Sequence, residues 1–531
     1  MATRTAKRLL AEFPHFRYGI GAAEHVPGYC AIALNYDTAY DCPGPREVVD
    51  RTGIAAGYRV YKEINHADVP WLLTYNGTNT RIYRLNAGVW QQRLEVATAQ
   101  GVDIVSAFGV VAVGYGSSRA YDFSSDSGAT WTASTQTGSA RYFTRAIFQS
   151  GHLTNPRVFY VVDPDLAFFT RDLTNTGTPS TSMTIGDNQT AQDSFRSLRE
   201  DDNGVLICGK RRALFAPQAD GSVIKLTPDY MDTTTDAGGQ GDRPNFEAFT
   251  EIEGRAYYVV EGYEIIEYFH GQINEAIAPH HNGPKIPRLH LPVNALTSAG
   301  EWLVVALGSA NTATLKNVAN APGGASRLAN SFGTTSELYK GRYQPDPKTG
   351  QLGMTWHGCI LQCTDLLRFA WWHEDDSFLY LSSGDSELIN EQQRRCYFLI
   401  LPPQFHQADA SAVILNAGAA TVECLGIGFG DDFSIVRLLE ARAHTLGLAA
   451  TAPSLRVDYR PFPDYETTAY RTAVTWNDNY HPPDGVRFPH FTTCRKTDLQ
   501  FVMTGTGNLY AMLGPVEVEA EPYLPEGVRR G

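Results

Sequence analysis

The chain has 531 residues, of which 43% are hydrophobic and 19% are charged. This balance is typical of a folded globular protein and excludes a chain that is disordered throughout. The formal net charge of -13 argues against a nucleic-acid partner, because binding to phosphates requires a basic surface. The length exceeds that of one ordinary hydrophobic core, so we expect two or more domains.

The N-terminal stretch from Met1 to Arg17 is basic but lacks the apolar run of a signal peptide. No segment approaches the ~20 consecutive apolar residues of a membrane-spanning helix, so we expect no membrane insertion. We therefore expect synthesis in a host cytoplasm, with assembly into a virus particle as a route out of the cell. The eight cysteines contain no CxxC pair and are expected to be buried free thiols.

Residues 1–60 are interrupted by Pro and Gly and are predicted to form an arm that closes or decorates the next domain. From 61 to 405, short apolar strands alternate with Gly, Asn or Asp turns. Examples are the strands 71–75, 81–85 and 89–90, which are separated by turns at Asn76-Gly77 and at 86–88. Later predicted strands are 102–108, 110–113, 120–123 (after a turn at 114–116), 158–162, 166–170, 205–208, 213–216, 256–260, 265–269, 302–307, 367–372 and 378–381.

These units recur at about 40–50 residues, which is the spacing of propeller blades. The pattern predicts a β-propeller of about six or seven blades over residues 61–405, with stacked β-sandwiches as the alternative. The stretch 311–355 is rich in Asn, Ala, Gly and Ser, and we expect an insertion or an elaborated loop there.

One turn carries a specific pattern, Ser-x-Asp-x-Gly-x-Thr-Trp, formed by Ser124, Asp126, Gly128, Thr130 and Trp131. This is the Asp-box pattern of hairpins on propeller blades. We expect the Asp126 carboxylate to accept bonds from amides ahead of it, and Gly128 to adopt a positive φ. We expect Trp131 to restart the strand by packing between sheets. The motif predicts a fold and no chemistry.

Residues 406–531 alternate more strictly between apolar and polar positions, and their loops are longer. We expect a C-terminal domain that is a jelly-roll-like antiparallel β-sandwich. Its predicted strands are 413–415, 421–424, 436–443, 455–460, 472–476, 499–503 and 516–520.

The combination resembles tail-associated virion proteins of tailed bacteriophages. The resemblance is carried by the leader at 28–35 and, in the C-terminal block, by 456–460, 492–495, 499–507 and 515–518 with Pro522. It implies a propeller that supplies a ring-like or collar-like scaffold and a sandwich that docks neighbours or sugars. The expected partners are then other virion proteins and copies of this chain, with a host-surface glycan or receptor as the alternative.

An Asp-box propeller also resembles sialidases, which implies a test for glycosidase residues. Tyr263, Glu264, Glu267 and Tyr268 are the right residue types for a tyrosine nucleophile and its activating carboxylate. On a strand, however, Glu264 and Tyr268 share a face with residues typical of blade packing. The sequence shows one clear Asp box where sialidases usually show several, so we predict no enzyme and no catalytic residue.

Four candidate metal-binding patterns are more simply explained as turns or solvated loops. None has a second cluster at ligand spacing or the twelve-residue calcium pattern, so we predict no metal and no cofactor. The adjacent Trp371 and Trp372 should point to opposite faces of a strand, where one could meet a partner or a sugar. The turns considered are His373–Asp376, His280–Gly283, Asp163–Asp165 and Asp201–Gly204.

Overall fold

The structure is a computed structural model. It describes residues 53–55, 57–115, 120–135, 173–174, 201, 204–217, 222–230, 245–262, 264–269, 271–274 and 293–308, together with the strands named below. For many of the remaining strands only the backbone is described. Every regular element in this part of the chain is a β-strand. No helix long and apolar enough to cross a membrane occurs in it.

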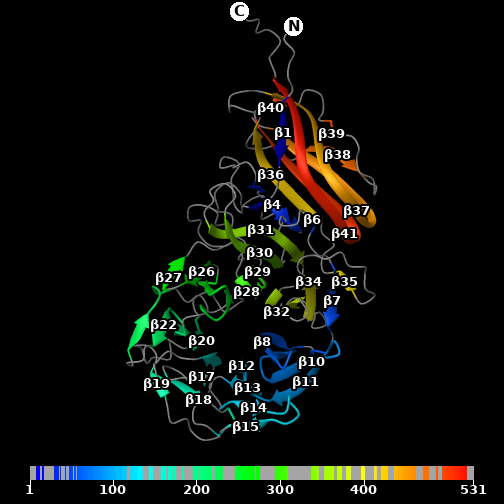
Figure 1. Cartoon of the computed structure of the whole chain (residues 1–531). Coiled ribbons are helices and arrows are strands. Elements are labelled where there is room, and N and C mark those ends of the chain that lie inside the picture. Colours follow the sequence, from blue (N-terminus) through cyan, green and yellow to red (C-terminus); the bar gives the residue numbers. More distant parts are fainter. Residues whose placement is uncertain are drawn as a thin grey trace, which may run out of the picture.

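Five four-stranded antiparallel sheets follow one another along the chain, each a simple meander of consecutive strands (Figure 1). The first contains β8 (Arg59–His66), β9 (Val69–Tyr75), β10 (Thr80–Asn86) and β11 (Val89–Val96), and the second β12 (Gly101–Ala107), β13 (Val110–Tyr115), β14 (Asp122–Ser124) and β15 (Thr132–Ala133). The third contains β16 (Phe143–Ala146), β17 (Arg157–Val162), β18 (Leu166–Thr170) and β19 (Ser182–Thr184). The fourth contains β20 (Phe195–Glu200), β21 (Leu206–Lys210), β22 (Leu214–Pro217) and β23 (Val223–Lys225), and the fifth β24 (Phe249–Ile252), β25 (Arg255–Val260), β26 (Glu264–Phe269) and β27 (Gln272–Asn274).

These sheets make the chain an all-β protein with a β-propeller, as the strand spacing predicted. The first strands of successive sheets contact one another: β8 contacts β12, and β12 contacts β16. The apolar cores lie between sheets. One packs Trp71 and Leu73 of the first sheet against Ile104 and Val113 of the second. Inner strands such as β9, β13 and β25 are buried on both faces, because a neighbouring sheet covers each side.

Two further groups of strands follow. β28 (Val293–Ala299), β29 (Trp302–Gly308), β30 (Ser336–Pro345) and β31 (Leu352–Cys363) pair in order and continue into a twelve-stranded sheet. β32 (Leu367–His373), β33 (Phe378–Ser383) and β34 (Cys396–Ile400) pair in order, and β7 (Glu47–Arg51) lies between β34 and β35 (Ala412–Ile414). β28 contacts both β24 and β32, and β32 also contacts β8.

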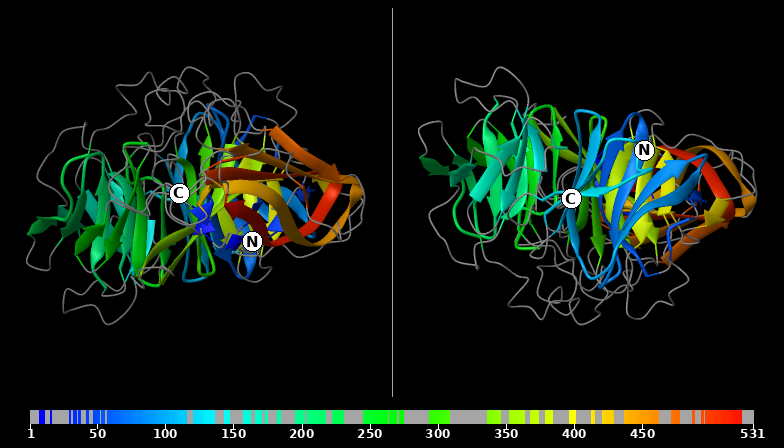
Figure 2. Two further views of the ribbon diagram at one scale, coloured as in Figure 1. Left: turned by 90° about the horizontal axis from the view of Figure 1, so that it is seen from above. Right: turned by 90° about the horizontal axis from the view of Figure 1, so that it is seen from below.

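The C-terminal region is built around two long antiparallel strands, β37 (Val436–Pro461) and β41 (Lys496–Pro522), which pair along nearly their whole length. Register shifts are concentrated in the middle of the pair, from Ala443 to Ser454, where bulges allow strands to bend. In Figure 2 these strands, in orange and red, lie on the opposite side of the molecule from the green strands of the third to fifth sheets. Their neighbours are β36 (Ala420–Gly428), β38 (Arg471–Trp476), β39 (Val486–Arg487) and β40 (Thr493–Cys494).

The N-terminal strands are distributed among several sheets. β1 (Lys7–Ala11) pairs with β41, whereas β4 (Ile32–Leu34) pairs with both β31 and β36. The short strands β2 (His15–Phe16) and β3 (Tyr29–Cys30) pair with each other, as do β5 (Tyr36–Asp37) and β6 (Cys42–Pro43). Segments from the start of the chain therefore lie beside strands from its end.

Four predictions of local structure were wrong. Gly114 and Tyr115 continue β13 instead of forming a turn, because the Tyr115 ring is buried and its hydroxyl bonds Asp122 at 2.8 Å. The loop or insertion expected at 311–355 contains β30, which pairs with β29 and β31 as part of a sheet, whereas 311–335 lie outside the described residues. The pairs of strands expected in 436–460 and 499–520 are single strands, β37 and β41, because bulges replace the expected loops.

Candidate functional site

The residues considered for sialidase-like chemistry are not brought together. Tyr263 lies outside the described residues, and Glu264 is the half-buried first residue of β26. Tyr268 is buried in the core between the fourth and fifth sheets. Glu267 lies opposite Tyr257 of β25, an odd number of residues from Glu264 and therefore on the other face of the strand.

Glu267 belongs to a buried cluster that joins two sheets. Its Oε1 forms an ion pair with Arg255 Nη1 at 3.1 Å. The Arg255 guanidinium lies 4.0 Å from the ring centroid of Phe269 and 4.0 Å from that of Tyr343 on β30. Burial, and secondly the nearby Glu267 carboxylate, raise the pKa of Tyr257. The cluster therefore fixes the fifth sheet to β30, and a tyrosine with a raised pKa is a poor nucleophile.

A second polar group connects the first strands of three successive sheets. Lys62 on β8 forms an ion pair with Asp103 on β12. The Asp103 carboxylate also accepts the amide hydrogens of Ile104 at 2.9 Å and of Phe143, on β16, at 2.7 Å. Burial raises the pKa of Asp103, and Lys62 opposes that rise. One carboxylate thus links β8, β12 and β16.

Arg199 makes the equivalent connection between the fourth and fifth sheets. Its Nε donates to the Tyr258 hydroxyl at 2.6 Å, and its Nη1 forms an ion pair with Glu251 on β24. Burial raises the pKa of Tyr258 to about 12, so the hydroxyl stays protonated at neutral pH. The sequence did not single out Lys62, Asp103 or Arg199, because each depends on a partner in another sheet.

Two groups near the first sheet have the perturbed acidity that functional sites often show. Burial raises the pKa of Glu63 on β8 to about 8, so this carboxyl group is protonated at neutral pH. His66 Nδ1 lies 2.8 Å from the Ser106 hydroxyl. Burial, and secondly the Arg84 charge, lower the pKa of His66, which leaves a neutral imidazole beside a hydroxyl. The ring also packs edge-on against Trp71, 5.9 Å between centroids.

The turn at residues 124–131 is closed by its own side chains. Asp126 Oδ1 accepts the Thr130 amide hydrogen at 2.9 Å, and Oδ2 accepts the Thr130 hydroxyl at 2.5 Å. Ser124 Oγ accepts the amide hydrogen of Gly128, whose φ is +83°. Bonds from Thr130, and then from Ser124, lower the pKa of Asp126 to about 2. Trp131 packs edge-on against Trp71 of the first sheet, with 6.4 Å between ring centroids.

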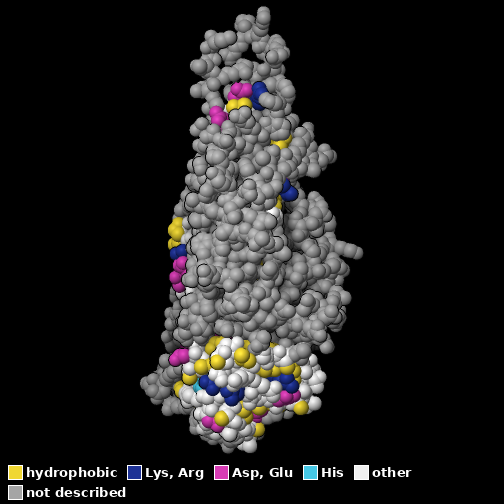
Figure 3. All heavy atoms as spheres, turned by 90° about the vertical axis from the view of Figure 1, so that its right-hand side faces the viewer, with side chains coloured by type: hydrophobic (Ala, Val, Ile, Leu, Met, Phe, Trp, Pro, Cys, Tyr) yellow, Lys and Arg dark blue, Asp and Glu magenta, His cyan; other side chains and the backbone are white. Residues whose placement is uncertain are grey.

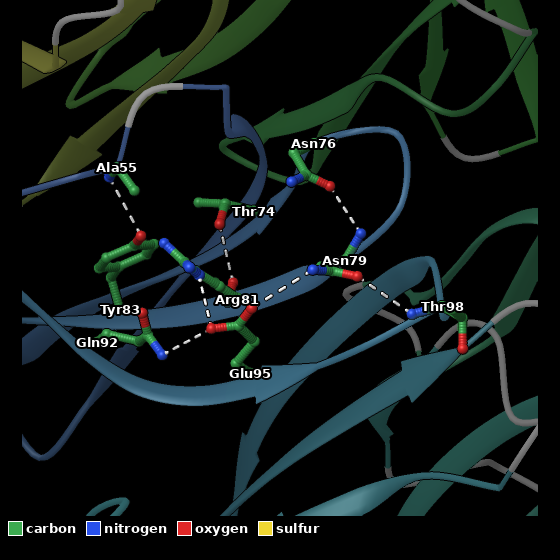
Figure 4. Close-up of polar contacts among 9 residues, drawn as sticks. All are labelled: Ala55, Thr74, Asn76, Asn79, Arg81, Tyr83, Gln92, Glu95 and Thr98. Atoms are coloured by element: carbon green, nitrogen blue, oxygen red, sulfur yellow. Dashed lines mark hydrogen bonds and ion pairs between the residues drawn. The ribbon is translucent and has the colours of Figure 1, made fainter.

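A surface network of polar side chains lies at one end of the first sheet (Figure 4). The Glu95 carboxylate accepts bonds from Arg81 Nε at 3.0 Å, Gln92 Nε2 at 3.3 Å and Asn79 Nδ2 at 3.4 Å. Asn79 Oδ1 in turn accepts the Thr98 amide hydrogen at 3.3 Å, in the turn before β12. These bonds hold two turns together and present a polar surface of fixed shape.

The candidate metal-binding turns are only partly described. Asp201 caps its own turn, because its Oδ1 accepts the Val205 amide hydrogen at 2.8 Å. His373, Trp371 and Trp372 lie on β32, of which the backbone alone is described. No group of three potential metal ligands occurs among the residues that the structure describes. The segments Asp163–Asp165, Asp202–Asn203, His280–Gly283 and Glu374–Asp376 lie outside them.

Two cysteines, Cys208 and Cys359, have described side chains, and both are buried free thiols. Burial raises the pKa of Cys208, which suppresses the reactive thiolate. These two thiols are therefore part of the packing of the sheets.

No family model and no curated protein matches the chain. Among solved structures, a streptogramin B lyase is 13% identical, with a TM-score of 0.42, over 68% of this chain and 99% of its own. Virginiamycin B lyase from Staphylococcus aureus is 11% identical, with a TM-score of 0.41, over 67% and 99%. The WD40 domain of Neurospora crassa Pan2 is 7% identical, with a TM-score of 0.40, over 66% and 95%. Such distant likenesses carry no inference about activity.

Proposed function

We propose that the protein is a non-catalytic structural component of a larger assembly, namely the virion of a tailed bacteriophage, in association with its tail. The observation that carries the proposal is the pairing of early strands with late ones: β1 with β41, β4 with β31 and β36, and β7 with β34 and β35. Unfolding of the N-terminal strands would break their pairing with strands from later in the chain. Such a chain suits a subunit that must stay folded for the lifetime of a particle.

The use of the buried charges supports a structural role. Asp103 and Arg199 each hold neighbouring sheets together, and Glu267 is paired with Arg255. Breaking any of these pairs to bind a substrate would leave a buried charge without its partner, which is costly. We therefore propose that the buried ion pairs in the propeller hold neighbouring blades together and do not bind a substrate.

We also propose that the propeller has seven blades. The five four-stranded sheets would be joined by β28–β31 as the sixth blade and by β32–β34 with β7 as the seventh. In support, β28 contacts β24 and β32, and β32 contacts β8 of the first sheet. The N-terminal strand β7 would then close the ring by completing its last blade, which is how a ring of separate sheets avoids a free edge.

The C-terminal strands would form the predicted jelly-roll-like sandwich and dock neighbouring virion subunits. The support is the bulged middle of β37 and β41. One half of this pair lies beside β36 and β38, and the other beside β1, β39 and β40. Strands that pass through a bend in this way join the two sheets of a sandwich at its corner.

The proposal is tested on the phage particles themselves. Virions are purified on a density gradient, and the chain is quantified by mass spectrometry against the major tail protein. We expect a fixed whole-number ratio to that protein across gradient fractions. A chain that stays with the soluble lysate would overturn the structural proposal. Binding of that soluble chain to host cells would then favour the alternative of a separate receptor- or glycan-binding protein.

A further inference from the structure

Two arginines of the first sheet, Arg84 and Arg93, have no carboxylate partner among the described residues, although the chain carries a net charge of -13. By contrast, Arg81 on the same sheet pairs with Glu95 at 3.0 Å. Arg84 lies 5.9 Å from the Trp71 ring, and Arg93 donates to the neutral Gln91 side chain at 3.0 Å. Two cations without acidic partners on an acidic protein are available to an external anion.

The strand geometry brings these two arginines together. Arg84 on β10 lies opposite Gln91 on β11, and Arg93 follows Gln91 by two residues. Arg93 is also the extra residue of a bulge, because Gln92 pairs with Tyr83 and Leu94 pairs with Ile82. Bulges redirect single side chains and are over-represented next to functional sites.

The surroundings supply further donors. Indole Nε1 of Trp71 and of Trp131, and Nε of Arg84 and of Arg93, are all buried and find no acceptor in the part of the chain that the structure describes. A Cβ on Gly128 would lie 2.7 Å from the Trp71 ring and 3.2 Å from Arg93 Cβ, so the turn at 124–131 packs directly against Trp71 and Arg93. A buried donor without a partner destabilises the folded protein, and an anion that accepts its hydrogen would remove that cost.

We propose that Trp71, Arg84, Arg93 and Trp131, the donor cluster, bind an oxyanion between the first and second sheets: a carboxylate, sulfate or phosphate group. Arg84 and Arg93 are only half-buried, so their guanidinium groups can turn towards a bound anion. The two guanidinium groups supply the charge, and the indole rings supply N–H donors and an apolar wall. Figure 3 shows Lys and Arg side chains beside hydrophobic ones on this end of the molecule.

The test measures binding of inorganic phosphate, sulfate and glucuronic acid to the full chain by calorimetry and tryptophan fluorescence at constant ionic strength. The variants are Arg84→Gln, Arg93→Gln and, as a matched control, Arg81→Gln. We expect saturable binding by the wild-type chain, a loss of at least tenfold in affinity for the first two variants, and wild-type affinity for the control.

The three probes separate the sources of the anion. Equal affinity for phosphate, sulfate and glucuronate supports a free-oxyanion site, and tighter binding of glucuronate alone supports an acidic saccharide. Absence of saturable binding of all three to the wild-type chain, or an equal loss in the Arg81→Gln control, would overturn the proposal. Circular dichroism of each variant confirms that a loss of binding is not a loss of fold.

Discussion

The ion pair between Lys62 and Asp103 offers the sharpest test of how the sheets are held together. Replacing Lys62 with Met removes the cation and leaves the Asp103 carboxylate, whose side chain is 2% exposed, with two amide donors. Removing one partner of a buried pair costs about 3–5 kcal/mol. The Lys62 side chain is 37% exposed, so solvent screens part of the interaction, and we expect a loss of about 2–3 kcal/mol at pH 8.

The loss should depend on pH in a defined direction. Burial raises the pKa of Asp103 in the folded state, and removing Lys62 raises it further. A carboxyl group whose pKa is higher in the folded state than in the unfolded state destabilises the fold when the pH exceeds its unfolded-state pKa. At a pH below that pKa, the group is protonated in both states and has no such effect. The deficit of Lys62→Met should therefore be largest at pH 8 and nearly vanish towards pH 4.

The assay is urea unfolding followed by tryptophan fluorescence at pH 4, 6 and 8. Lys225→Met is the control, because Lys225 and Asp229 form an exposed pair, 2.7 Å apart, that should contribute under about 1 kcal/mol. The reasoning is refuted if Lys62→Met matches this control at pH 8, or if its deficit grows towards acidic pH.

Three further predictions concern single positions. Glu63→Gln should stabilise the protein at pH 7 by up to about 3 kcal/mol, at about 1.4 kcal/mol per pH unit between the ordinary pKa of 4.5 and pH 7. The gain should vanish near pH 4 in urea titrations, and an equal gain at both pH values would contradict the raised pKa. Gly128→Ala should cost about 2–3 kcal/mol, because its Cβ would meet Trp71 at 2.7 Å and φ is +83°. Gly77→Ala, with φ +94° and open space, should cost about 1 kcal/mol, and equal melting temperatures for the two variants would contradict the steric argument. Arg199→Met should lower the melting temperature by several degrees, because it leaves Glu251 without its ion-pair partner and removes a hydrogen bond to Tyr258. An unchanged melting temperature would show that Arg199 does not stabilise the contact between these two sheets.

The sequence was informative where a feature is local. Strands such as β9, β10 and β25 could be predicted because apolar runs and turn residues are read from neighbouring positions. The partners of Asp103 and Arg199 could not be predicted, because each lies in another sheet. An arm at 1–60 was predicted, but the pairing of its strand β7 with β34 was not, because the two strands are far apart in the sequence. The donor cluster was missed for a related reason. Trp131 drew attention as part of a turn, but its relation to Trp71 exists only in the packed molecule.

The central claim is that this propeller is a building block of a particle, and cryo-electron microscopy of the native virion tests it most directly. We predict symmetry-related copies around the tail axis, each with a seven-bladed ring closed by β7 and C-terminal strands in contact with a neighbouring subunit. A virion map that accounts for all tail density without this chain would contradict the claim.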